Sequence, residues 1–261
     1  MPQANFPTET YLHSLITGRL AELLAGFDGH PVLDDPLAGH VEGIEDFERF
    51  AAERRAWLEQ RMARVEPLRT TRNAQRTVSE NLLHLHLAQG FVALPVAVVG
   101  EHGQPGWLKA VRVYHSLWPL FGEHRVRPAI LKPDPDRQLT DVVAEYQHAL
   151  AVGDVDAIVN TFESDGYFRE PAGGDYIYEG LDRLRDFMSQ ILSAGGITLE
   201  HCTVTDDGTA CAIEFNAVAF GPRPLVSQAG VAVYERGATG RLWGARVYDD
   251  VNVEAYSSQS A

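Results

Sequence analysis

Apolar residues in the second half of the chain recur first at helical spacing and then at strand spacing. Three stretches repeat an apolar position every three or four residues, which predicts amphipathic helices: 139–152, 154–164 and 179–192. Four later stretches have strand character and are separated by turn residues: 197–204, 209–220, 225–235 and 242–251. Helices followed by a meander of strands predict an α+β fold, with N-terminal helices packed on one face of a strongly bent antiparallel sheet.

The first half of the chain repeats the second. Residues 11–39 lie on residues 146–174 with a constant shift of 135 and no gap. The coinciding residues include Tyr11 with Tyr146, His13 with His148, Gly18 with Gly153, Asp35 with Glu170 and Pro36 with Pro171. Later segments match in the same order: 42–50 with 179–187, 96–99 with 231–234, and 106–114 with 240–248. Such a match over a whole half-chain indicates a tandem duplication.

A stiff linker separates the two copies. Residues 127–139 carry three prolines and alternating charges, without a helical or strand period. We therefore expect domains at 1–130 and 139–261, joined by residues 131–138. The first domain follows the same order of elements, with a longer and more charged helix at 44–64.

The charge of the chain restricts its partners. The net charge is −14, with 36 Asp and Glu residues against 22 Lys and Arg residues. A field of this sign repels nucleic acid and anionic membrane surfaces, so we expect a neutral or uncharged small molecule, or another protein, as the partner. The enzyme functions considered below take a largely apolar small molecule as substrate. Cys202 and Cys211 have no metal-like spacing. The chain contains no apolar run of membrane-spanning length and no signal-peptide pattern at its start, and we expect a cytoplasmic protein.

The opening of the second copy, YQHALAVGDVDAIVNTFESDGYFREPAGG, resembles the ketosteroid-isomerase-like and SnoaL-like proteins of the nuclear transport factor 2 (NTF2) superfamily. The resemblance covers nearly all of residues 140–255 and implies two tandem cone-shaped NTF2-like domains, each enclosing an apolar pocket. It implies that Tyr146 donates a hydrogen bond to a substrate oxygen, that Glu170 shuttles protons and that Tyr248 lines the pocket. The second oxyanion donor of the isomerases, a protonated Asp, falls near Gly230 or Val231, where no acid is present.

The tandem architecture is similar to the lasalocid-type epoxide hydrolase–cyclases of polyether biosynthesis, which use a pair of carboxylates in each domain. The resemblance implies the pairs Asp35 with Glu66 and Glu170 with Glu200. The duplicated Tyr11 and Tyr146 complete the catalytic candidates. Strand alternation directs Glu200 either to the cavity or to solvent.

Several further residues are candidates for substrate binding: Tyr114, Tyr248, Trp243, Glu214, Asn216, His84 and His86. Tyr114 and Tyr248 recur in the repeated RVY strand, each on the face of an arginine. Glu214 and Asn216 share one strand face, which lines either the pocket or an interface between sheets. The two histidines have metal-like spacing, but no third ligand is evident, and we expect neither a metal nor a cofactor.

Three functions remain open. The first is a cofactor-free enzyme that opens epoxides on a polyketide-like substrate and closes cyclic ethers by general acid–base catalysis. The second is proton transfer next to a carbonyl group, as in a double-bond isomerase or an aldol-type polyketide cyclase. The third is a non-catalytic binding protein, in which the two domains form an intramolecular pseudo-dimer through their sheets. A further homodimer is also open.

Overall fold

The computed structural model describes residues 8–104 and 107–251. The chain divides into two units, Met1–Gly122 and Glu123–Ala261, each of which is described by itself. The predicted linker at 131–138 lies in the second unit, where it is hydrogen-bonded to two strands of the sheet. The amide of Asn216 donates to the carbonyl of Leu131 at 3.0 Å, and the backbone N–H of Asp134 donates to the carbonyl of His201 at 2.8 Å.

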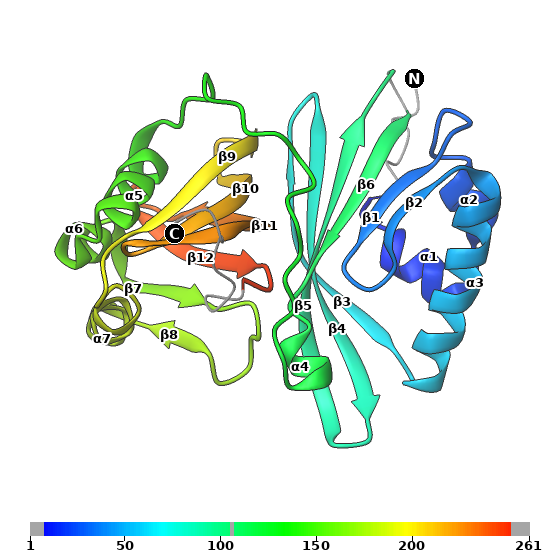
Figure 1. Ribbon diagram of the computed structural model, residues 1–261, viewed down its shortest axis with the longest axis horizontal. Helices are drawn as coiled ribbons and strands as arrows, with labels where there is room; N and C mark the ends of the chain where they lie inside the picture. Colours follow the sequence, from blue (N-terminus) through cyan, green and yellow to red (C-terminus); the bar gives the residue numbers. More distant parts are fainter. Residues whose placement is uncertain (1–7, 105–106, 252–261) are drawn as a thin grey trace. The chain divides into compact units, whose positions relative to one another are not determined.

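Both units are built from the same order of elements, and the first unit has a further short helix, α4, after its last strand (Figure 1). The first unit contains α1 (Tyr11–Thr17), α2 (Leu20–Leu24), β1 (Val32–Asp35), β2 (Gly39–Glu42), α3 (Ile44–Gln60), β3 (Arg64–Arg72), β4 (Arg76–Leu87), β5 (Gly90–His102), β6 (Leu108–Tyr114) and α4 (Trp118–Phe121). The second contains α5 (Asp141–Val152), α6 (Val155–Asn160), β7 (Phe162–Arg169), β8 (Ile177–Glu179), α7 (Leu181–Ile191), β9 (Ile197–Asp206), β10 (Ala210–Phe220), β11 (Arg223–Arg236) and β12 (Leu242–Tyr248).

Each unit forms one six-stranded sheet, and the strand orders correspond one to one. They are β2-β1-β6-β5-β4-β3 and β8-β7-β12-β11-β10-β9. The predicted α+β class and the internal duplication are confirmed, but the prediction of a purely antiparallel sheet is wrong. Strand β1 pairs in parallel with β6, and β7 in parallel with β12. A parallel pair needs a long connection, which one helix and four strands of the same unit provide here.

Two predicted helices end earlier in the structure. The stretch 154–164 is helical only to Asn160, and Phe162 begins β7. Asp154 caps the start of that helix by accepting the backbone N–H of Ala157 at 2.9 Å. The predicted helix at 44–64 ends at Gln60, two residues before Met62 adopts a positive φ of 48°.

One face of each sheet packs against the helices of its own unit, and we call it the inner face. In the first unit its core includes Leu33, Leu85, Val98 and Val111, packed with Tyr11 and Phe47 of the helices. In the second it includes Phe168, Phe215, Ala232 and Ala245, packed with Tyr146 and Leu184. The opposite side of each sheet is called the outer face.

The last two strands of each unit pair in the same register. This register differs by one residue from the sequence match of 96–99 with 231–234. Ala97 lies opposite Tyr114, and Val231 lies opposite Tyr248. The counterpart of Val231 is therefore Ala97 rather than Val96. A shift by one residue exchanges the inner and outer faces of a strand, so this difference decides which side chains of β11 reach the core.

Candidate functional site

Two acids of the second unit lie together on the inner face, immediately after parallel neighbouring strands. Phe168 on β7 pairs with Ala245 on β12, and both belong to the core. Side chains alternate along a strand, so Glu170 follows Phe168 onto the inner face, and Asp249 follows Val247. A Cβ at Gly230, on the neighbouring β11, would lie 2.9 Å from Cβ of Asp249. Asp249 therefore occupies space that the glycine leaves open.

Asp249 has the properties of an acid that keeps its proton near neutrality. The residue is only partly exposed. Burial of the carboxyl group raises its pKa from 3.8 to about 7, and the negative charges of Asp250 and Glu170 contribute in the same direction. The backbone N–H of Val251 and the charge of His124 oppose this shift. The parallel register that pairs Arg169 with Arg246 brings Glu170 and Asp249 to the same end of two adjacent strands.

Glu170 accepts a hydrogen bond from a tyrosine that stacks on a second aromatic ring. The hydroxyl of Tyr178 donates to Oε1 of Glu170 at 2.6 Å. Desolvation, together with this hydrogen bond, raises the pKa of Tyr178 to about 12, so the phenol keeps its proton. The ring of Tyr178 stacks on Phe187, with centroids 4.0 Å apart and an interplanar angle of 14°. The acid therefore has an oriented donor on one side and apolar surface around it.

Two buried tyrosines lie on the same inner face. Tyr146 of α5 and Tyr234 of β11 are each 2% exposed, and their ring centroids are 5.1 Å apart. Burial raises the pKa of both phenols, and the charge of Asp249 adds to the shift at Tyr234. Both remain protonated hydrogen-bond donors at neutral pH. The second unit thus brings two acids and protonated phenols into one apolar interior.

The first unit has side chains at the positions that correspond to this site, but their chemical groups and partners differ. Asp35, Tyr11 and His115 line a cavity of only about 30 Å³, close to the volume of one water molecule. Asp35 is 6% exposed, and its Oδ1 accepts the backbone N–H groups of Leu37 and Ala38, both at 2.9 Å. The guanidinium of Arg54 binds the same oxygen. Asp35 is therefore both an inward-facing acid and a turn-capping acid, and its charge is neutralised by Arg54.

A substitution at Tyr11 tests the hydrogen bonding in the interior of the first unit. Its hydroxyl is buried and has no hydrogen-bond partner among the described residues. Tyr11→Phe removes an unsatisfied polar group, and we expect it to raise the free energy of unfolding of the first unit by about 1 kcal/mol. Urea unfolding of the full chain measures the change. A loss of stability would contradict the absence of a partner.

The predicted second acids do not join the first. Glu66 and Glu200 are exposed on the outer faces of β3 and β9, because Val65 and Leu199 next to them pack against the cores. Nε2 of His84 lies 2.9 Å from a carboxylate oxygen of Glu66, whose side chain is 56% exposed. His84 and His86 contact the ring of Phe91, each with centroids 5.5 Å apart. None of these residues borders the core.

The remaining substrate-binding candidates also lie away from the inner faces. Tyr114, Tyr248, Glu214 and Asn216 lie on the outer faces, since their sequence neighbours Val113, Val247, Ile213 and Phe215 pack inward. Trp243 is 40% exposed and contacts Tyr167 edge to face, with centroids 5.1 Å apart. The shared face of each RVY tyrosine with its arginine is as predicted. Arg112 with Glu101 at 2.8 Å and Arg246 with Glu235 at 2.9 Å form the same ion pair in both units.

Asp249, His115, Gln147, Tyr234 and His201 were not identified from the sequence. Asp249 and His115 follow the two RVY tyrosines, and the same alternation, continued by one residue, would have placed them inward. His201 faces inward with Leu199, two residues earlier on β9, whereas a β-bulge between Glu214 and Phe215 shifts the register of the strand beyond His201. No sequence pattern marks that bulge.

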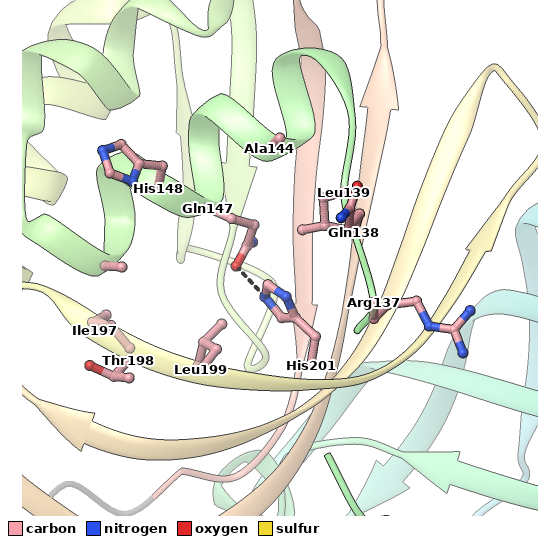
Figure 2. A pocket seen from close by; sticks show the side chains of 11 residues that line it. Arg137, Gln138, Leu139, Ala144, Gln147, His148, Ile197, Thr198, Leu199 and His201 are labelled. Carbon is pink, nitrogen blue, oxygen red and sulfur yellow. Dashed lines mark hydrogen bonds between the residues drawn. The ribbon is translucent and has the colours of Figure 1, made fainter. Parts of the chain in front are cut away.

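A groove of about 430 Å³ lies between α5 and β9, and the figure shows its lining (Figure 2). Gln147 and His201 face one another there and are joined by a hydrogen bond of 3.0 Å. The apolar walls include Leu139, Ile197 and Leu199. Across residues 8–104 and 107–251, no three His, Cys, Asp or Glu side chains are grouped to hold a metal ion. In the same part of the chain, no helix is long and apolar enough to cross a membrane.

The element order, sheet topology and inner-face core define an α+β protein made of two units. Within it, residues 143–245 match the model of the SnoaL-like domain. No curated protein matches the chain.

Three similar solved structures each cover less than half of this chain. An NTF2-like protein of unknown function from Cytophaga hutchinsonii is 20% identical over 44% of this chain and 94% of its own, with a TM-score of 0.35. The epoxide hydrolase/cyclase-like enzyme SalBIII, which has a role in pyran ring formation in the polyether salinomycin, is 26% identical over 41% and 87%, with a TM-score of 0.36. An epoxide hydrolase from M. tuberculosis, described as LEH-like, is 20% identical over 42% and 80%, with a TM-score of 0.36.

Proposed function

We propose that the second unit is a cofactor-free acid–base catalyst that opens an epoxide on a largely apolar small molecule. One observation carries the proposal: Glu170 and Asp249 follow adjacent strands on the inner face, and burial raises the pKa of Asp249 to about 7. A protonated carboxyl group and a carboxylate can act as acid and base in one turnover. The pair replaces the predicted pair of Glu170 with Glu200.

The reaction assigns one proton transfer to each acid. Asp249 gives its proton to the epoxide oxygen as the carbon–oxygen bond of the ring breaks. Glu170 takes the proton of the attacking hydroxyl as the new carbon–oxygen bond forms. If the hydroxyl belongs to the substrate, the product is a cyclic ether, and if it belongs to water, the product is a diol. A proton then returns from Glu170 to Asp249 to complete the cycle.

Proton transfer next to a carbonyl group is a second candidate, and the buried phenols favour it. Tyr146 and Tyr234 keep their protons, and Asp249 supplies a further neutral donor beside Gly230. The acid that an isomerase needs for its oxyanion therefore comes from the neighbouring strand. Glu170 would act as the base on carbon in that case.

The first unit is proposed to be structural. The Arg54 guanidinium and two backbone N–H groups already occupy Oδ1 of Asp35, and the adjoining cavity of about 30 Å³ cannot hold an organic substrate. The pairing of the two units through their sheets stays a prediction.

Three probes distinguish the candidate reactions. The purified chain is incubated with an apolar terminal epoxide, with a hydroxy-epoxide that can close a five-membered cyclic ether, and with a β,γ-unsaturated cyclic ketone. We expect turnover of an epoxide, with the added oxygen or the ring closure read by mass spectrometry in ¹⁸O-labelled water. Conversion of the ketone to its conjugated isomer, without epoxide turnover, would replace the first candidate by the second. No turnover of any probe contradicts both.

A further inference from the structure

Three polar side chains of the second unit form one hydrogen-bonded chain between the groove and the interior. Nε2 of His201 lies 3.0 Å from Oε1 of Gln147, and Nε2 of Gln147 donates to the hydroxyl of Tyr234 at 2.6 Å. Gln147 is 8% exposed and Tyr234 is 2% exposed, whereas His201 is partly exposed and lines the groove. The chain therefore runs from a solvent-accessible wall to a phenol inside the core.

The chemistry of the amide fixes the direction of this chain. Oε1 of Gln147 can only accept, so Nε2 of His201 must carry the hydrogen. Desolvation lowers the pKa of His201, so its imidazole is neutral near pH 7 and the hydrogen resides on Nε2. The amide nitrogen of Gln147 can only donate, which makes the Tyr234 oxygen an acceptor. The phenol hydrogen of Tyr234 then remains for a further acceptor.

A chain with all donors in one direction polarises its last member. Each hydrogen bond strengthens the next, and an interior of low dielectric increases the effect. The final donor is Tyr234, which contacts the Tyr146 ring and lies within the field of Asp249. A neutral amide does not pass a proton along, so the chain orients and polarises the phenol rather than conducting protons from the groove.

The first unit lacks this arrangement. The repeat places Leu12 at the position of Gln147. The register of β5 and β6 places Gly100 at the position of Tyr234, where a Cβ would collide with the Thr8 side chain. The hydrogen-bonded chain is therefore specific to the unit that holds the two acids.

We propose that Tyr234 donates a hydrogen bond to a substrate oxygen that gains negative charge, and that Gln147 and His201 are positioning residues for this phenol. The inference rests on the proposed function for its substrate and names a binding preference that can be tested separately. The ligands that such a donor favours are apolar molecules with one oxyanion, such as phenolates, enolates and alkoxides.

Binding of β-naphthol tests this inference without turnover. Its ultraviolet absorbance separates the phenol from the phenolate, so one titration reports both affinity and ionisation. A hydrogen bond to a charged acceptor contributes enough that we expect Tyr234→Phe to weaken naphtholate binding about tenfold. Gln147→Leu, which copies the residue of the first unit, is expected to weaken it about threefold and to lower kcat with little change in KM.

His148→Leu is the matched control for His201→Leu. Both histidines line the groove, but only His201 belongs to the chain. We expect His201→Leu to weaken naphtholate binding and His148→Leu to leave it unchanged. Equal effects of the two variants, unchanged binding in Tyr234→Phe, or no binding of β-naphthol to the wild type would each overturn the inference. If Tyr234→Phe does not fold, Gln147→Leu carries the same test.

The outcomes also separate this inference from the proposed function. Glu170→Gln is expected to abolish epoxide turnover and to retain naphtholate binding. Tyr234-dependent binding without turnover of any epoxide would leave the inference standing and remove the proposed reaction. Glu170-dependent turnover with unchanged kinetics in Tyr234→Phe would leave the proposed reaction standing and remove the inference.

Discussion

Glu170→Gln is expected to reduce turnover of the epoxide by about 10²–10⁴-fold, with the fold of the second unit retained. The amide keeps the size of the side chain and can still accept from Tyr178, whose hydroxyl lies 2.6 Å from Oε1. It cannot take a proton from the attacking hydroxyl, and loss of a general base costs a factor of this size. Steady-state kinetics with the responsive epoxide probe measure the change, and far-UV circular dichroism checks the fold.

Glu200→Gln is the matched control for this substitution. Glu200 is exposed on the outer face of β9, whereas the resemblance to the epoxide hydrolase–cyclases pairs it with Glu170 as the second catalytic acid. We expect the variant to retain wild-type turnover. A comparable loss in Glu200→Gln would restore the pair predicted from the sequence and would contradict the site at Glu170 and Asp249.

Asp249→Asn is expected to reduce turnover about 10²-fold and to change the pH dependence of the rate. The wild-type reaction needs the neutral form of Asp249, which exists below its raised pKa. The wild-type rate should therefore fall as the pH increases through about 7. Asparagine does not titrate, so the small residual rate of the variant should lack this decline. A wild-type rate that rises through pH 7, or an unchanged profile in the variant, would contradict a proton-donor role.

Unfolding experiments provide the control for Asp249. Its folded-state pKa of about 7 lies above the ordinary value of 3.8, so the folded protein binds the proton more tightly than the unfolded chain. The stability that this proton contributes is fully present below about pH 4 and is lost as the pH rises through 7. Asp249→Asn should escape this loss and exceed the wild type at pH 8 by on the order of 2 kcal/mol. A variant that loses both activity and stability at pH 8 would indicate a structural role.

The duplication explains why much of the fold follows from the sequence. The apolar spacing of helices 139–152 and 179–192 and the four later strands each reflect a local pattern, and the repeat supplies a second copy with the same elements. What the pattern missed depends on long-range pairing. The first residues of β7, 162–164, were predicted as the end of a helix because they continue an apolar spacing, whereas the pairing of β7 with β12 makes them part of a strand.

The candidate site was also predictable from the sequence only in part. Asp35 and Glu170 could be identified because the repeat places them at one register before a proline, and the structure places both on inner faces. Their chemistry could not be predicted, because Arg54 reaches Asp35 from α3, 19 residues away in sequence, while Asp249 joins Glu170 from the other end of the second unit. Such partners are set by sheet register and helix packing, which no local pattern records.

The sequence by itself determined the two-copy organisation, the α+β class and the first acid of each copy, because these depend on spacing within short segments. Only the tertiary structure decided which side of each sheet a residue faces. It also decided that Asp35 is paired with an arginine and that burial raises the pKa of Asp249. These properties depend on strand register, on a β-bulge and on burial. A shift of one residue exchanges the two faces of a strand, and the distance between two carboxyl groups is set by chain segments that lie far apart in sequence.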